Sequence, residues 1–254
     1  MSLFPGRSDD GVGTPTTPPL PIARHDGRRR LGSREAWPPR SPAAPQAACE
    51  LKIADHPIAR HALTALRDRS TGAERFRMFS SQLLLILAIE AMRSMPTREE
   101  PVETAADRQA GTVLAKRVVF LSLTRHGLGL AHDLAAFIPN AMVGAVSVDR
   151  TSRDKDPEPR LHLAGAPALG DVRVILFAPI VATGLSAALA LDLLRRSGAT
   201  DVSLLSFVVS AQGLANLQSN APGLTIWTAA VDSGWDAKRG PMPGIGDFGE
   251  RLYG

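Results

Sequence analysis

From residue 51 onward, short apolar runs alternate with segments in which apolar residues recur every three or four positions. The apolar runs predict buried strands at 116–124, 141–148, 172–177, 202–209 and 224–231. The segments with three- or four-residue spacing predict helices at 56–69, 71–95, 127–137, 186–197 and 212–219. Strands that alternate with amphipathic helices form a mostly parallel sheet with helices on both faces, so the sequence predicts an α/β fold.

Two local signals refine this outline. Thr71 and Glu74 have the spacing of a capping box, which predicts that the second helix begins at Thr71. The segment 151–169 is polar and contains prolines, which is typical of an exposed loop.

Residues 1–50 differ from the rest of the chain in composition. They are rich in Pro, Arg, Gly and Ser and show almost no apolar periodicity. Such a segment buries too little apolar surface to offset the entropy of ordering it, so we expect it to be disordered. It is either an extension without a role or a tail that attracts a partner. The predicted organisation is therefore an extension at 1–50 and one domain at 51–254.

Composition and charge then narrow the classes of function. The chain has 254 residues, a formal net charge of +4 and one cysteine, Cys49, which excludes an internal disulfide and a cysteine-rich metal site. No Lys/Arg cluster with interleaved aromatics appears, so we expect no nucleic-acid partner. The longest largely apolar run, at 83–91, is too short to span a membrane, and no signal-peptide core precedes the domain. We expect a cytoplasmic protein without a membrane partner.

The most informative motif lies at 178–186, directly after the strand predicted at 172–177. It reads Ala-Pro-Ile-Val-Ala-Thr-Gly-Leu-Ser and leads into a helix. The backbone N–H groups of the first helical turn and the hydroxyls of Thr183 and Ser186 are donors for an anion, and the helix dipole favours negative charge there. Gly184 lets the backbone approach a ligand closely. The motif therefore predicts a phosphate-binding loop, although it contains no carboxylate.

Three further motifs follow predicted strands. Arg125 and His126 lie in a Thr-Arg-His-Gly-Leu-Gly turn, Arg150 ends another strand, and Asp247 lies in a glycine-rich tail. An arginine can bind a diphosphate through two hydrogen bonds. Glycine-rich backbone can present N–H and C=O groups to a flat heterocycle.

Taken singly, these features have ordinary explanations. Arg125 or Arg150 can be a solvated surface residue and His126 a structural histidine. Asp232, which follows the strand predicted at 224–231 in an Asp-Ser-Gly sequence, is more typical of a turn than of a general base. Their joint position at the strand ends of one α/β domain is more informative, because ligands of such folds bind there.

In this order, the motifs resemble those of the uracil phosphoribosyltransferase family over about residues 51–254. The resemblance begins at His56-Pro57 and continues through Glu74-Arg-Phe-Arg77. The turn at Arg125 is similar to the family's Arg-Ala-Gly-Leu-Gly, and the loop 178–186 is similar to its Asp-Pro-Met-Leu-Ala-Thr-Gly-Gly-Ser. The tail Pro-Gly-Ile-Gly-Asp-Phe-Gly-Glu-Arg-Leu-Tyr-Gly is the most specific match, since the family's uracil-recognition segment reads almost the same.

The resemblance implies a type I phosphoribosyltransferase fold, a homo-oligomer, and Mg²⁺ carried by the diphosphate substrate without a protein metal ligand. It implies that phosphoribosyl diphosphate contacts Arg125, Arg150, Ala178, Pro179, Ile180, Val181, Ala182, Thr183, Gly184, Leu185 and Ser186. It implies that the base contacts Pro241, Met242, Gly246, Asp247 and Phe248. The candidate catalytic residues are Arg125, His126 and Asp247.

The chain departs from the family at several of these positions. Ala178 replaces the loop aspartate, Leu185 replaces a glycine, and His126 replaces a small residue. Ser210-Ala-Gln-Gly replaces the family's Ala-Pro-Glu-Gly, and Pro241 removes a backbone N–H from the tail.

Three hypotheses are therefore open. The protein keeps the family reaction and makes uridine monophosphate from uracil. Alternatively, its site serves another heterocycle or acceptor, with or without phosphoribosyl diphosphate, and His126 acts there as a general acid or base. The third hypothesis is a non-catalytic protein that binds a nucleotide or regulates a partner.

Overall fold

The computed structural model describes residues 48–148, 159–165, 167–236 and 240–254. All of them belong to one compact unit, Ala44–Gly254. The extension expected at 1–50 lies outside the described residues except for its last three, of which Glu50 begins a strand.

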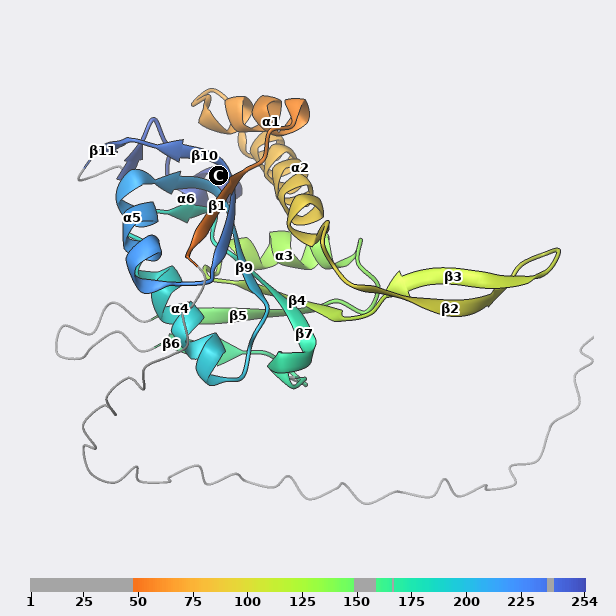
Figure 1. The fold of residues 1–254 in the computed structure, drawn as a ribbon. Helices are drawn as coiled ribbons and strands as arrows, with labels where there is room; N and C mark the ends of the chain where they lie inside the picture. The colour runs from red at the N-terminus through yellow and green to blue at the C-terminus, as the bar shows by residue number, and fades with distance from the viewer. Residues whose placement is uncertain (1–47, 149–158, 166, 237–239) are drawn as a thin grey trace, which may run out of the picture. The chain divides into compact units, whose positions relative to one another are not determined.

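Within the described residues, eight strands form a central sheet in the order β1-β10-β9-β7-β4-β5-β6, with β8 beside β9 (Figure 1). Their bounds are β1 Glu50–Ile53, β4 Arg117–Ser122, β5 Met142–Val148, β6 Pro159–His162, β7 Val172–Phe177, β8 Ile180–Val181, β9 Val202–Ser210 and β10 Thr225–Asp232. The strands pair in parallel except at one edge, where β6 runs antiparallel to β5. The predicted parallel sheet is confirmed.

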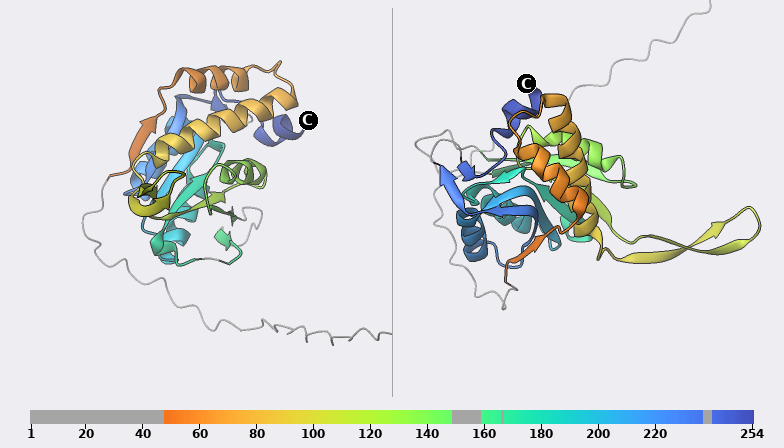
Figure 2. Two further views of the ribbon diagram at one scale, coloured as in Figure 1. Left: turned by 90° about the vertical axis from the view of Figure 1, so that its right-hand side faces the viewer. Right: turned by 90° about the horizontal axis from the view of Figure 1, so that it is seen from above.

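Helices cover both faces of this sheet (Figure 2). The helices α1 Pro57–Arg67, α2 Ala73–Met92, α3 Gly127–Ala135 and α6 Phe248–Tyr253 pack on one face, and α4 Leu185–Arg196 and α5 Ala211–Asn220 pack on the other. Alternate residues of β4 show the division, because Phe120 lies in the first core and Leu121 in the second. This is the two-residue period of a strand buried on both sides.

The predicted capping box of the second helix is wrong. The N-cap of α2 is Gly72, which makes no side-chain capping bond. The Asp68 carboxylate accepts hydrogen bonds from the backbone N–H and the hydroxyl of Ser70, and the Thr71 N–H donates to the Asp68 carbonyl. This local turn keeps Thr71 outside the helix, so the helix begins later than the spacing predicted.

A hairpin that the sequence analysis did not predict extends away from the sheet (Figure 1). It consists of β2 Thr97–Glu103 and β3 Arg108–Leu114, and every residue of β2 is exposed. Because neither face of β2 is buried, its sequence lacks the apolar alternation that identifies a half-buried strand.

Shorter elements complete the chain. The 151–169 segment, predicted to be an exposed loop, contributes strand β6 and the start of the short helix η1 Leu169–Asp171 where the structure describes it. The tail forms the strand pair β11 Gly234–Asp236 and β12 Gly240–Met242 before α6. In the described part of the chain, no helix has the length and apolar character needed to cross a membrane.

Candidate functional site

A cavity of about 200 Å³ lies where β4 and β7 end. Residues 178–186, which we call the phosphate loop, form most of its wall. The loop residues that line the cavity are Ala178, Ile180, Val181, Ala182, Thr183, Gly184 and Ser186. Pro179 and Leu185 do not line it: Pro179 is buried, and Leu185 is 44% exposed. Leu123, Thr124, Val148 and Ala187 complete the lining.

The phosphate loop is tied to the sheet at its start and to α4 at its end. The Ala178 N–H donates to the Leu205 carbonyl at 3.0 Å, and the Pro179 carbonyl accepts from the Phe207 N–H at 3.0 Å. Gly184 caps α4 with a φ of +76°, in the region that favours glycine. A Cβ there would also lie 2.7 Å from the Gly213 carbonyl oxygen. Gly184 is therefore required by its backbone conformation and by the approach of α5, besides any approach of a ligand.

Helix α5 is bonded directly to the phosphate loop. The Ser210 hydroxyl donates to the Ala182 carbonyl and accepts from the Gly213 N–H at 2.8 Å. The Asn216 side-chain amide donates to the Thr183 carbonyl at 2.7 Å. The sequence analysis noted Ser210 as a departure from the family and did not identify Asn216. No local motif marks either residue, since both bonds join segments that are distant in sequence.

The cavity wall carries no charged side chain in the described part of the chain. Ala178 is 2% exposed and belongs to the apolar core that contains Val119 and Leu121. The described residues also contain no cluster of three or more His, Cys, Asp or Glu side chains arranged to hold a metal ion. An anion in this cavity would therefore meet backbone N–H groups and hydroxyls.

Arg125 and His126 lie beside the cavity without lining it. Arg125 is exposed after β4, and its Nε–H donates to Nε2 of His126 at 3.1 Å. The His126 ring lies against α6, where a Cβ on Gly249 would be 2.6 Å from its Cε1 atom. Its centroid is 5.8 Å from that of Tyr253. His126 thus joins the turn that carries Arg125 to the C-terminal helix. Arg150 lies outside the described residues.

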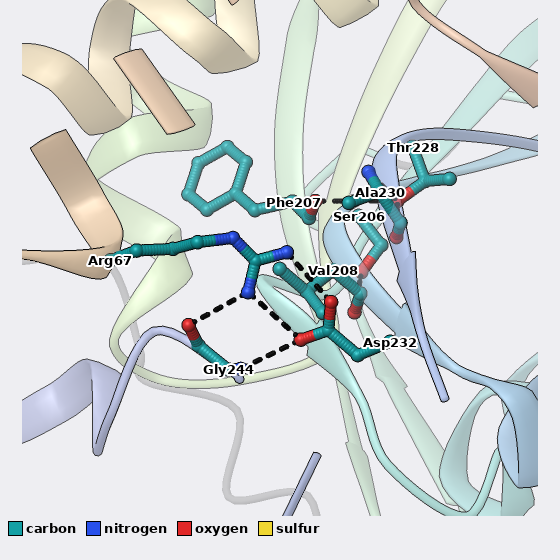
Figure 3. Close-up of polar contacts among 8 residues, drawn as sticks. All are labelled: Arg67, Ser206, Phe207, Val208, Thr228, Ala230, Asp232 and Gly244. Atoms are coloured by element: carbon teal, nitrogen blue, oxygen red, sulfur yellow. Dashed lines mark hydrogen bonds and ion pairs between the residues drawn. The ribbon is translucent and has the colours of Figure 1, made fainter. Parts of the chain in front are cut away.

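A partly buried ion pair holds the tail (Figure 3). Asp232, at the end of β10, is 2% exposed and binds Arg67 of α1 through two hydrogen bonds of 2.6 and 3.0 Å. Gly244 completes the network, since its N–H donates to Asp232 at 2.7 Å and its carbonyl accepts from Arg67 at 3.0 Å. The sequence analysis took Asp232 as a turn residue and did not identify Arg67. The feature of the sequence that could have pointed to a role for Asp232 is its position at the end of a predicted strand.

Arg251 also holds the tail. Its guanidinium lies 4.3 Å from the Phe76 ring centroid and donates to the Ile245 carbonyl at 2.9 Å and the Asp68 carbonyl at 2.6 Å. Burial lowers the pKa of Arg251, while the Asp68 carboxylate opposes that shift. The group stays charged, because an arginine keeps its proton in proteins.

The predicted base-binding residues divide into buried and exposed positions. Pro241 is buried in β12, whereas Met242 and Gly246 are exposed. Phe248 packs in the core, with its ring centroid 5.7 Å from that of Phe76, so its side chain supports the tail. Asp247 is exposed, and its carboxylate caps α6 by accepting the Glu250 N–H at 2.9 Å.

Comparisons with known proteins agree with this fold. A family model described as "Uracil phosphoribosyltransferase" matches residues 53–254. A Thermus thermophilus protein named uracil phosphoribosyltransferase is 32% identical over 80% of this chain and 98% of its own length. A Caulobacter relative of the same name is 34% identical over 80% of this chain and 97% of its own length. The solved structure of the AQ2163 protein from Aquifex aeolicus matches with a TM-score of 0.71 and 25% identity, over 80% of this chain and 97% of that one.

Proposed function

The chain belongs to the uracil phosphoribosyltransferase family, and from this membership we propose that it forms uridine monophosphate and diphosphate from uracil and phosphoribosyl diphosphate. The observation that carries the proposal is the cavity at the phosphate loop. It lies at the carboxyl edge of a parallel sheet, and its wall offers backbone N–H groups and hydroxyls to an anion.

In this reaction, N1 of uracil forms a bond to C1 of the ribose while the bond from C1 to the diphosphate oxygen breaks. The electron pair leaves with the diphosphate, and the N1 proton passes to solvent. Positive charge develops on the ribose and negative charge on the leaving diphosphate. Catalysis therefore depends on alignment and on groups that stabilise the departing anion.

We assign the roles as follows. Thr183, Gly184 and Ser186 hold the 5′-phosphate, and Arg125 neutralises the diphosphate, which brings Mg²⁺ with it as part of the substrate. Arg150, outside the described residues, is the second expected arginine. The backbone at 241–247 holds the base, and the Arg67–Asp232 pair keeps that backbone in position.

Ala178 separates this chain from the family pattern. Losing a hydrogen bond to a charged group costs about 1.5–3 kcal/mol, or about one to two decades in rate or affinity. The first test incubates the protein with Mg²⁺, phosphoribosyl diphosphate and uracil, and quantifies uridine monophosphate by mass spectrometry beside an Ala178→Asp variant. Product from the wild-type chain supports the proposal.

The wall of uncharged side chains specifically favours a second candidate, in which the same scaffold serves another heterocycle or acceptor. Consumption of phosphoribosyl diphosphate with a different base, and none with uracil, would support that candidate. Binding without turnover across a panel of bases would instead indicate a non-catalytic nucleotide-binding protein.

We also propose that the protein is a homo-oligomer. Helix α2 exposes the side chains of Met78 and Ile89, which are 47% and 52% accessible. In the β2–β3 hairpin, both faces of β2 are exposed. A two-stranded hairpin is marginally stable by itself in water. Light scattering during size-exclusion chromatography gives the mass in solution, and a monomer would contradict this proposal. The cytoplasmic location stays a prediction.

A further inference from the structure

We propose that Ser210 and Asn216 are positioning residues that turn two consecutive peptide N–H groups of the phosphate loop into the cavity. The inference rests on the proposed function, because it assumes that this loop binds a phosphate. It adds a second layer of residues, one at the N-cap of α5 and one within α5, on which the affinity for that phosphate depends.

The two side chains bind consecutive carbonyl groups. Ser210, the N-cap of α5, donates its hydroxyl to the Ala182 carbonyl, and Asn216 donates its amide to the Thr183 carbonyl at 2.7 Å. The Asn216 amide is held in this orientation, because its Oδ1 atom accepts a hydrogen bond from the Asn220 amide. The Ser210 hydroxyl is similarly fixed, since it also accepts the Gly213 N–H at 2.8 Å.

Because a peptide group is planar, these hydrogen bonds also fix the direction in which the following N–H groups point. In a trans peptide the carbonyl and the following N–H point to opposite sides. With the carbonyls of Ala182 and Thr183 bonded to α5, the N–H groups of Thr183 and Gly184 face away from α5. Both residues line the cavity, and among the described residues neither N–H donates to a protein acceptor. Successive N–H groups of this kind form a concave anion site.

The close approach of α5 makes these bonds possible. A Cβ on Gly213 would lie 2.5 Å from the Ala182 carbonyl oxygen, so helix and loop touch through their backbones.

The test measures binding of ribose 5-phosphate by titration calorimetry to the full chain and to Ser210→Ala, Asn216→Ala and the double variant. We expect each single change to weaken binding about fivefold and both together about 20-fold, as for the loss of neutral hydrogen bonds. Ser210→Thr keeps the hydroxyl and should restore most of the affinity. Matched controls on the same helix are Ser219→Ala, whose hydroxyl donates to the Ala215 carbonyl, and the exposed Gln218→Ala, and both should bind as the wild type does.

Amide NMR supplies a readout that a merely structural role would not change. Ribose 5-phosphate should shift the amide protons of Thr183 and Gly184 in the wild type, and less in Ser210→Ala and Asn216→Ala at saturating ligand. Equal affinity and equal shifts in these variants would overturn the inference and leave the proposed function standing. An equal loss in Ser219→Ala would also overturn it, as general damage to α5. A wild type that does not bind ribose 5-phosphate would overturn both the phosphate site and the inference.

Discussion

The two halves of the candidate site are held in different ways. The tail that follows β10 is fixed by charge: Arg67 and Asp232 bind each other and both backbone polar groups of Gly244, and Arg251 binds further carbonyls. The phosphate loop is fixed by neutral hydrogen bonds to β9 and α5, and its cavity carries no charged side chain in the described part of the chain.

This difference shows which kind of interaction fixes the position of each half. A partly buried ion pair that also satisfies a glycine backbone allows little displacement, because any shift leaves the buried Asp232 carboxylate or the Gly244 N–H unpaired. Neutral bonds to a loop cost less to break, but they aim its N–H groups at the ligand. The base side should therefore respond to substitution mainly in stability, and the phosphate side mainly in binding and rate.

The largest expected effect is on the base side, in Asp232→Ala. Removing this carboxylate costs about 3 kcal/mol, because Arg67 and the Gly244 N–H lose their acceptor. The value is at the low end for a buried pair, since the Arg67 side chain is 22% exposed to water. For a domain of this size, that corresponds to a fall in melting temperature of about 10 °C. Differential scanning calorimetry measures it, with the exposed Asp133→Ala as the matched control. Equal melting temperatures for the two variants would show that the tail is not held by charge.

On the phosphate side, Ala178→Asp tests the rate, against the loss of stability caused by a carboxylate at a position that is 2% exposed. A carboxylate at this position should raise the production of uridine monophosphate by about 10- to 100-fold, the value of a charge-assisted hydrogen bond. The matched control is Ala178→Asn, which has nearly the same size and no charge. A fall in rate for both variants would mean that the cavity has been rebuilt around the alanine, whose neighbours Val119 and Leu121 are apolar.

Gly184→Ala tests whether the loop is held by its backbone. The left-handed conformation costs an alanine about 1–2 kcal/mol, and the added Cβ would lie 2.7 Å from the Gly213 carbonyl oxygen. We expect a melting temperature lower by about 3–8 °C and weaker binding of ribose 5-phosphate. Gly129→Ala is the contrasting control, because it lies inside α3 with open space around it and should be neutral or stabilising.

The sequence was sufficient for the five strands β4, β5, β7, β9 and β10 and for the course of the loop at 178–186. It was insufficient for the strands β1, β6 and β8 and for the contacts that hold the loop and the tail. Strands β4, β7 and β9 are buried on both faces, so their apolar runs are continuous and easily recognised. The loop at 178–186 follows a strand and leads into a helix as expected, because that pattern is local, and its binding of a phosphate stays a prediction. The partners of Asp232 and Thr183 are Arg67, 165 residues away, and Asn216, 33 residues away, and no periodicity connects such pairs. The packing of Phe248 was missed for the same reason, since a local motif could not show that its ring faces Phe76.

The smallest effect is expected at His126, which joins the two halves. Its ring packs on α6 and accepts the Nε–H of Arg125, and it does not line the cavity. His126→Ala should therefore raise the KM for phosphoribosyl diphosphate about threefold, by freeing Arg125, and leave kcat nearly unchanged. His126→Asn retains an acceptor and should recover part of that loss. A large fall in kcat with unchanged binding of ribose 5-phosphate would contradict this and indicate that His126 transfers a proton. In that case the residue that joins the two halves of the site would itself take part in the reaction, and the division into a base side and a phosphate side would no longer describe the site.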